Sequence, residues 1–361
     1  MIIRKLKVLG IESTCDETAA SIIEWNYNGK VKILSNIIHS QIKNHSDFGG
    51  VVPEIAARAH QENISYVVEK ALKVSQLNSN SISAIATSCG PGLIGGLIVG
   101  ASFGKSFAIA SKIPFIPINH LEAHILSPRL IHNVEFPYIA LLVSGGHTQI
   151  LYVKGINKID RIGTTLDDAV GETFDKGAMI LKLGWPGGKI IEEYAKNGNC
   201  LKFNLPKPMF GKVGADFSFS GLKTALYRKV SSISMTKKMQ FDMAASFQHT
   251  ISEVLVDRCI NAMSILRKKR KPFKSFVLVG GVAANEYIKI KLNNLADREG
   301  LSFFCPPLNL CTDNAAMVSW AGIEYIINFG INNVDNLDFI PRPRWPLDPK
   351  SKPIGRAKHA R

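Results

Sequence analysis

The sequence predicts an α/β protein made of two related lobes that face a cleft. The main evidence is a pattern that occurs twice, at 6–25 and again at 138–153: an apolar strand, a turn of small polar residues and a second strand. A third apolar strand, 275–279, also ends in glycines. Because helical stretches follow the strands in both halves, we expect each half to form a layered α/β core.

The first half is expected to begin with three strands and a long helix. The strands are predicted at 6–11, 18–25 and 31–38. The polar turn Ser13-Thr14-Cys15-Asp16-Glu17 joins the first two strands, and Asn28-Gly29 is a hairpin signal before the third. Apolar residues at helical spacing predict a helix over 53–72.

Residues 82–104 contain no charged side chain, so the run could be mistaken for a membrane span. Gly90-Pro91-Gly92 interrupts it after a short strand at 83–87, which predicts a strand, a tight turn and a buried glycine-rich helix. The first residues lead directly into a strand and leave no room for a targeting peptide. We therefore expect a soluble, cytoplasmic protein with no membrane association.

The second half repeats the hairpin and then continues with helices. Strands are predicted at 138–143, 147–153 and 275–279. A helical stretch at 166–183 ends in a glycine- and proline-rich segment, 184–188, and further helices are expected to begin near Asn285 and Asp313. The proline-rich segment 341–346 cannot be helical, and a basic tail follows it.

The composition is that of a globular protein with a polyanionic partner. The chain has 361 residues, of which 46% are hydrophobic and 20% charged, and this length is enough for two domains. The formal net charge of +15 favours nucleic acid as a partner first and an anionic membrane second. The six cysteines form no C-x-x-C pair, so neither a zinc knuckle nor a disulfide framework is indicated.

Two histidines are spaced four residues apart in His120-Leu121-Glu122-Ala123-His124. On a helix both imidazoles lie on one face, where both can reach one metal ion. Glu122 is two positions after His120, about 200° round the helix, and so points away from that face. In the metallopeptidase pattern H-E-x-x-H the glutamate follows the first histidine directly. The pair predicts a metal site but a poor peptidase, with two core or solvated histidines as the alternative.

Three turns of small residues each end an apolar strand. They are Ser13-Thr14, Ser144-Gly145-Gly146 and Gly280-Gly281. Small residues let backbone N–H groups approach phosphate oxygens, although none of the turns has P-loop or dinucleotide-binding spacing. A single turn of this kind is ordinary, whereas three within a two-lobed pattern favour a nucleotide cleft.

Seven motifs then follow one another in a characteristic order. They are Ile11-Glu12-Ser13-Thr14-Cys15-Asp16-Glu17-Thr18, His120-Leu121-Glu122-Ala123-His124, Val143-Ser144-Gly145-Gly146-His147-Thr148-Gln149, Gly171-Glu172-Thr173-Phe174-Asp175-Lys176, Asp216-Phe217-Ser218-Phe219-Ser220-Gly221-Leu222-Lys223-Thr224, Gly280-Gly281-Val282-Ala283-Ala284-Asn285 and Cys311-Thr312-Asp313-Asn314-Ala315-Ala316-Met317. From about Leu6 to Pro346 the chain resembles the bacterial-type TsaD family (Gcp or YgjD, formerly O-sialoglycoprotein endopeptidase) of tRNA N6-adenosine threonylcarbamoyltransferases.

The resemblance implies the two-lobed actin-like/sugar kinase/Hsp70 (ASKHA) ATPase fold, with a duplicated β-hairpin-led α/β core. The expected first lobe is 1–118, completed by 314–346. The expected second lobe is 119–313 and carries the metal and nucleotide site, and 347–361 is expected to be a flexible basic tail.

The implied reaction moves a threonylcarbamoyl group from threonylcarbamoyl-adenylate to N6 of the adenosine 3′ of the anticodon, in tRNAs reading ANN codons, and releases AMP. The implied partners are tRNA, a paralogous actin-like subunit (TsaB type) and a small P-loop ATPase (TsaE type). A separate TsaC-type synthase supplies the adenylate. A metal-dependent peptidase and a non-enzymatic ATP- and tRNA-binding scaffold remain alternatives.

By the same resemblance His120, His124 and Asp313 hold one divalent metal, Fe2+ or Zn2+, and leave coordination positions open. The adenine nucleotide enters as part of the substrate. The implied substrate contacts are Val143, Ser144, Gly145, Gly146, His147, Asp175, Gly188, Glu192 and Asn285. Leu142 stands where archaeal and eukaryotic relatives carry a tyrosine ligand, so we expect that ligand to be absent.

Four groups of charged residues are assigned less sharply. Asp16 and Glu17 are candidate catalytic residues that orient the nucleophile or a metal-bound water, or only cap the turn. Asp167-Asp168 are expected to start a helix. Lys223 is either a solvated helix residue or a contact with the other lobe. The basic run 267–271 must face water, where it either binds tRNA phosphates or only aids solubility.

Overall fold

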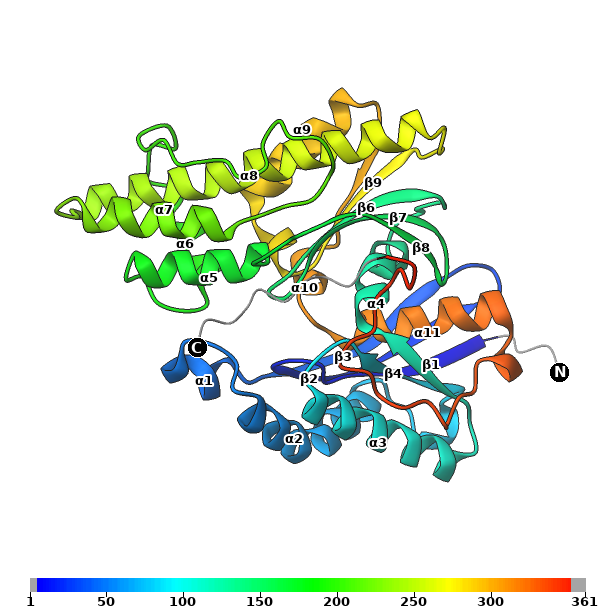
Figure 1. Cartoon of the computed structure of the whole chain (residues 1–361). Helices are drawn as coiled ribbons and strands as arrows, with labels where there is room; N and C mark the ends of the chain where they lie inside the picture. Colours follow the sequence, from blue (N-terminus) through cyan, green and yellow to red (C-terminus); the bar gives the residue numbers. More distant parts are fainter. Residues whose placement is uncertain (1–4, 352–361) are drawn as a thin grey trace. The chain divides into compact units, whose positions relative to one another are not determined.

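The computed structural model describes residues 5–351 (Figure 1). The chain divides into two compact units. Within the described residues, the first comprises 5–133 together with Thr312–Leu347, and the second comprises Val134–Cys311 together with 348–351. The main segment of the second unit, Val134–Cys311, is therefore inserted into the chain of the first.

Each unit is built around one five-stranded sheet, and the two sheets have the same strand order. The first sheet has the order β3-β2-β1-β4-β5, and the second, read in the same sense, has the order β8-β7-β6-β9-β10. In each unit the first two strands form an antiparallel hairpin, and the first strand also pairs with the fourth in parallel. This topology confirms the predicted duplication of a hairpin-led α/β core.

The first unit contains the three predicted amino-terminal strands and the predicted long helix. Its strands are β1 (Lys5–Glu12), β2 (Glu17–Asn26), β3 (Val31–Ser40), β4 (Ala84–Gly90) and β5 (Phe115–Asn119). Its helices are α1 (Ile42–His45), α2 (Pro53–Val74), α3 (Ile94–Ser111), α4 (His120–Leu126) and α11 (Ala315–Phe329).

The second unit contains the repeated hairpin and a helical layer. Its strands are β6 (Tyr138–Val143), β7 (Thr148–Gly155), β8 (Lys158–Thr164), β9 (Ser275–Val279) and β10 (Ser302–Phe304). Its helices are α5 (Val170–Ile180), α6 (Gly187–Ala195), α7 (Ser220–Ser231), α8 (Lys237–Lys268), α9 (Glu286–Arg298) and α10 (Leu308–Cys311). The single helix expected at 166–183 is shorter than predicted, and the segment expected to end it instead opens α6.

Alternation along β1 places its side chains in two layers of the first unit. Leu9 and Ile11 pack in a cluster with residues of α2 and α3, whereas a Cβ on Gly10 would meet α11 on the opposite face. Figure 1 shows α2 and α3 on one side of this sheet and α11 on the other. Because both faces of the central strand are covered, β1 reads as an apolar run.

Helix α3 is the one helix among residues 5–351 that is long and apolar enough to cross a membrane. One face of α3 is buried, whereas Ile98 and Ile109 on the other are 50% and 63% exposed. The prediction of a buried glycine-rich helix therefore holds for one face only. A Cβ on Gly96 or Gly100 would come within 2.2 Å of Ser13 atoms, so these glycines let α3 lie directly against the first hairpin turn.

The boundaries of the two units differ from the expected lobe boundaries. Residues 119–133 and Thr312 to Asp313 belong to the first unit, not to the second. The reason is packing against α11: the Tyr325 hydroxyl donates to Glu122 (2.8 Å), and the Arg129 Nε donates to Glu324 (2.6 Å). Of the expected tail, 347–361, only the part up to Ser351 lies within the described residues.

The contact between β1 and α11 gives a stability prediction. A Cβ on Gly10 would lie 2.4 Å from Ser319 Oγ and 2.5 Å from the Ala315 carbonyl oxygen. Gly10→Ala should therefore lower the free energy of unfolding by ~1–3 kcal/mol, measured by urea denaturation. Gly50→Ala is the control, because its Cβ would meet nothing within 4 Å. Equal midpoints for the two variants would contradict this packing.

Candidate metal centre and substrate site

The metal-site histidines lie on α4, which begins directly after the buried strand β5. The Asn119 side chain caps this helix by accepting hydrogen bonds from Leu121 N (3.0 Å) and Glu122 N (3.3 Å). The cap fixes the first helical turn, so His120 lies at the carboxyl ends of the parallel strands β1, β4 and β5. A strand followed immediately by a capped helix thus gives His120 a defined position.

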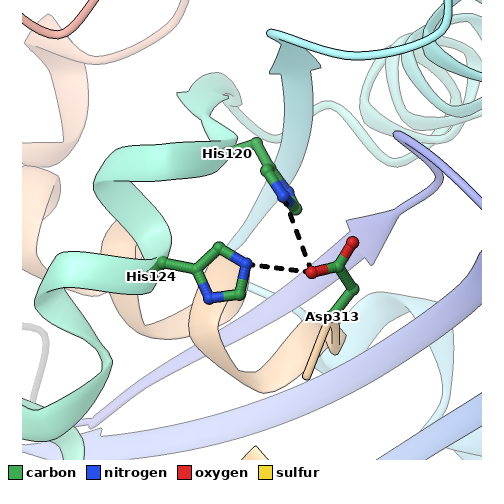
Figure 2. A group of neighbouring side chains, drawn as sticks. All are labelled: His120, His124 and Asp313. Atoms are coloured by element: carbon green, nitrogen blue, oxygen red, sulfur yellow. Dashed lines mark hydrogen bonds and ion pairs between the residues drawn. The ribbon is translucent and has the colours of Figure 1, made fainter. Parts of the chain in front are cut away.

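His120, His124 and Asp313 converge as the sequence predicts, and their ligand atoms all lie within 4.8 Å of one another (Figure 2). Asp313 Oδ1 is 2.9 Å from His124 Nε2 and 3.6 Å from His120 Nε2. The imidazoles are nearly perpendicular, with an interplanar angle of 88°. His120 is 7% exposed and His124 is 1% exposed, so both rings are shielded from bulk water.

The chemistry and spacing of these three side chains fit one metal ion. In a tetrahedral site with bonds of about 2.0–2.2 Å, ligand atoms lie about 3.3–3.6 Å apart. Two imidazole nitrogens and one carboxylate oxygen are the donor set of many open zinc and iron sites. The group can therefore hold a metal ion and still leave positions for other ligands.

Glu12 is a site residue that sequence reasoning did not assign. Its Oε2 lies 2.9 Å from His120 Nδ1 and accepts a hydrogen bond from Ser88 Oγ (2.5 Å), while its Oε1 accepts one from Thr14 N (2.8 Å). Because Glu12 engages Nδ1, the Nε2 atom of His120 is the nitrogen directed to Asp313. The available signal was an acidic residue in the last position of β1, directly after the uncharged, buried run 8–11.

The two buried partners hold one another in their charged forms. Burial opposes the charge on His120, but the carboxylates of Glu12 and Asp313 outweigh it and raise the pKa of His120 to about 9. Burial would raise the pKa of the Glu12 carboxyl, but the charge and hydrogen bond of His120 hold it below its ordinary value. Without a metal, His120 is therefore protonated at neutral pH.

The first hairpin turn carries the candidate residues Asp16 and Glu17 in the same unit. Burial, together with the carboxylates of Asp313 and Asp16, raises the pKa of the Glu17 carboxyl well above its ordinary value. Glu17 and Asp313 are thus close enough for their charges to interact. The Asp16 carbonyl accepts a hydrogen bond from Gln41 N (2.9 Å), which fixes the end of the turn.

Glu122 lies away from the metal-site face of α4, as its position in the sequence predicts. It is 2% exposed, and its Oε2 accepts a hydrogen bond from the Tyr325 hydroxyl (2.8 Å). A peptidase base would have to lie beside a metal-bound water. This orientation does not match the metallopeptidase arrangement.

In the second unit, the predicted phosphate-binding turn joins β6 to β7. Ser144 N donates to the His147 carbonyl (2.8 Å), and His147 N donates to Ser144 Oγ (3.1 Å). A Cβ on Gly145 or Gly146 would meet nothing within 4 Å, so the backbone at both positions borders open space. The Ser144 carbonyl accepts a hydrogen bond from Gly171 N (3.2 Å), which places the start of α5 beside this turn.

The remaining implied substrate contacts are joined by hydrogen bonds between helices α5, α6 and α9. Asp175 Oδ1 accepts from Gly187 N (2.7 Å), next to Gly188, and Glu192 Oε1 accepts from Glu286 N (2.8 Å). Glu286 follows Asn285 directly in the chain. The structure therefore brings Asp175, Gly188, Glu192 and Asn285 into one connected set.

Asn285 and Val143 close this set at the ends of β6 and β9. Asn285 Oδ1 accepts from Ile288 N (3.0 Å) as the cap of α9, and its Nδ2 donates to Gln248 (2.8 Å). A Cβ on Gly280, at the end of β9, would lie 2.4 Å from the Val143 carbonyl oxygen. Leu142 is fully buried in β6 and offers no ligand atom.

Two interpretations of charged residues are corrected in the second unit. Asp167 does not start α5, which begins at Val170; it caps α7, accepting from Phe219 N (2.7 Å) and Ser220 N (3.2 Å). Lys223 forms an ion pair with Asp168. It is therefore not a solvated residue, and its partner does not belong to the other lobe. Asp167 and the start of α7 are about fifty positions apart in the sequence, so their proximity in the fold could not be predicted from sequence spacing.

The basic run 267–271 at the end of α8 is exposed at every position, as predicted. Arg267 forms an ion pair with Glu299, which leaves Lys268, Lys269, Arg270 and Lys271 as the more available cations.

Comparison with known proteins supports the resemblance. The family model for tRNA N6-adenosine threonylcarbamoyltransferase (TsaD) matches residues 32–320. Proteins of that name from Brucella ovis and Brucella abortus are 48% identical over 352 residues, covering 97% of this chain and 97% of theirs.

Solved structures of more distant proteins agree on the fold. The HypF structure from T. kodakarensis has a TM-score of 0.58 at 15% identity over 92% of this chain, and a full-length HypF structure has a TM-score of 0.54 at 15% identity over 90%. The chain spans about half of each, 49% and 47%. The predicted ASKHA fold class is confirmed, and the chain belongs to the TsaD family of tRNA N6-adenosine threonylcarbamoyltransferases, enzymes that modify tRNA.

Proposed function

We propose that this chain transfers the threonylcarbamoyl group of threonylcarbamoyl-adenylate to N6 of the adenosine 3′ of the anticodon, in tRNAs reading ANN codons. The adenosine amine attacks the carbamoyl carbonyl, the bond from that carbon to the phosphate oxygen breaks, and AMP leaves as N6 loses a proton. The observation that carries the proposal is the His120, His124 and Asp313 group with Glu12 behind it, in a member of the TsaD family.

The substrate is already activated, so no covalent nucleophile is required. Holding the amine against the carbonyl supplies part of the barrier reduction, roughly 7–11 kcal/mol in favourable cases. A bound Fe2+ or Zn2+ would supply Lewis acidity toward the substrate's oxygens. Asp16 and Glu17 are proposed to orient the incoming amine, because the first hairpin turn that carries them follows Glu12, the partner of His120.

The second unit is proposed to hold the adenylate. Backbone N–H groups of Gly145 and Gly146 would donate to the phosphate, since no side chain covers these two glycines. Ser144, whose own N–H donates to the His147 carbonyl, would hold the turn in shape. Val143 and His147 border this turn. Asp175, Gly188 and Glu192 would contact the ribose, and Asn285 has a second Nδ2 hydrogen for the adenosine beyond the one given to Gln248.

The proposed macromolecular partners are tRNA, a TsaB-type actin-like subunit and a TsaE-type P-loop ATPase, with a TsaC-type synthase as the source of adenylate. The proposal places the reaction in the cytoplasm. The net charge of +15 fits a polyanionic substrate.

The first test removes the metal ligands. His120→Ala, His124→Ala and Asp313→Ala should each lower bound metal below half and reduce transfer at least tenfold, because each removes one of three protein ligands. Metal content is measured by mass spectrometry and transfer by modified tRNA. The exposed His132→Ala variant is the control. Wild-type metal content in all three ligand variants would refute the assignment.

The second test concerns the Glu12–His120 pair and pH. Because the pKa of His120 is about 9 without metal, binding must displace a proton, and zinc affinity should rise ~tenfold per pH unit from 7 to 9. Glu12→Gln should weaken zinc binding at pH 9 by ~10–100-fold and flatten this rise. Zinc affinity is measured by competition with a chromophoric chelator, and a profile unchanged by Glu12→Gln would contradict the role of Glu12.

The third test separates transferase from peptidase. With threonylcarbamoyl-adenylate, tRNA and the partner proteins, the enzyme should release AMP and modified tRNA in equal amounts, and it should leave glycoproteins intact. Glu122 is bonded to Tyr325 on the wrong face of α4 for a peptidase base. Metal-dependent proteolysis that Glu122→Gln abolishes would reverse the conclusion.

A further inference from the structure

A loop of the second unit presents apolar and basic side chains to solvent. We define the 206–214 loop as the segment Pro206–Gly214, between α6 and α7. Val213 is 100% exposed and Phe210 is 47% exposed, and Lys207 and Lys212 are also exposed. No acidic residue occurs in 200–215. The loop therefore offers an aromatic ring and two ammonium groups to a partner.

Polar side chains of α8, among them the buried Arg258, hold this loop in one shape. Arg258 is 0% exposed, and its Nη1 donates to the carbonyls of Lys212 (2.9 Å) and Gly214 (3.2 Å). Asn261 Nδ2 donates to the same two carbonyls, at 2.8 and 3.0 Å. Asp257 pairs with Arg258 and accepts from Gly211 N (3.3 Å).

This anchoring is costly for a segment that buries little apolar surface of its own. Burying a guanidinium and its carboxylate partner costs several kcal/mol per ion unless their hydrogen bonds are satisfied. Met209 also adopts a left-handed backbone, with φ of 61°, which is uncommon for a non-glycine residue. A fixed loop shape with exposed Phe210 and Val213 is typical of a surface that contacts a ligand.

The charges around the loop favour a polyanion as that ligand. Lys207 Nζ lies 5.2 Å from the centre of the Phe210 ring and 3.7 Å from Glu253. Lys291 also reaches Glu253, at 3.9 Å. One carboxylate is thus shared by two lysines, and Lys212 has no acidic partner among the described ion pairs. An acidic molecule with unpaired bases matches both the ammonium groups and the exposed ring.

We propose that the 206–214 loop, with Lys291 beside it, is a tRNA-contacting surface. Lys207 and Lys212 contact backbone phosphates, and Phe210 packs on an unstacked base, as aromatic side chains do at single-stranded nucleotides. This inference rests on the proposed function in that tRNA is the acceptor substrate. It adds where on the second unit that substrate is held.

The test is tRNA binding by the full-length protein over a salt series. Lys207→Ser/Lys212→Ser should raise the Kd about tenfold and reduce the slope of log K against log salt by ~1–2. Phe210→Ala should raise the Kd ~5–100-fold with an unchanged salt slope, because stacking releases no counterions. Phe210→Tyr keeps an aromatic ring and should bind tRNA like the wild type. Thermal unfolding checks that each variant is folded.

Two matched variants serve as controls. Lys30→Ser/Lys32→Ser removes two exposed lysines of the first unit and should leave the tRNA Kd within about twofold. Lys268→Ser/Lys269→Ser/Arg270→Ser tests the basic run at the end of α8 as the competing surface. A Kd that depends on this run, and not on the 206–214 loop, would overturn the proposal.

The outcomes separate this proposal from the proposed function. If the loop variants bind tRNA like wild type while the wild-type enzyme still transfers the threonylcarbamoyl group, the function stands and the loop assignment fails. If the loop variants keep their tRNA Kd but lose binding to a partner subunit, the loop is a protein interface and the proposal is wrong. Weakened tRNA binding with unchanged affinity for adenylate supports it, whether or not transfer is detected.

Discussion

The buried contact between Glu12 and His120 is the interaction on which the candidate metal centre depends. A carboxylate with no exposure at the end of a strand would be strongly destabilising if unpaired. Here it is engaged by His120, Ser88 and Thr14, which come from α4, β4 and the first hairpin turn. One side chain thus connects three elements and also directs His120 Nε2 toward Asp313.

The two units carry different residues at the same end of the same sheet topology. In the first unit, the ends of β1, β4 and β5 carry Glu12, Ser88 and His120, which form a metal-type site. In the second, the ends of β6 and β9 carry the open glycine turn and Gly280. Parallel neighbours β1 with β4, and β6 with β9, bring residues distant in sequence to one edge, which is where ligands bind in α/β folds.

The sequence predicted what depends on local spacing. The helical i, i+4 pair His120 and His124 and the position of Glu122 away from the metal-site face follow from helix geometry, and both are found. Asp313 could be assigned only through the family resemblance, because it lies 189 positions from the nearer histidine. Where a role depends on a distant partner, local reasoning failed.

Three residues show why such roles were missed. Asp167 looks like the start of the helix that follows it, yet it caps α7, and its partners become visible only in three dimensions. Glu12 looks like the end of an apolar strand, yet it is bonded to His120, 108 positions away. Arg258 is similar, because a cation in a long helix gives no sign that it holds the 206–214 loop.

The positions of the three metal-site residues along the chain link metal binding to the stability of the first unit. The first unit is interrupted after Asn133 by the segment Val134–Cys311 of the second unit and resumes at Thr312, and Asp313 is the second residue of the returning segment. Both histidines lie before the inserted segment and Asp313 lies after it, so the insertion separates the three ligands in the sequence. Closing so long a loop carries an entropic cost that the contacts of α11 with β1 and α4 must offset. An ion bound by all three ligands would bind the folded first unit and not the open chain, and would therefore stabilise the joined segments as well as the substrate.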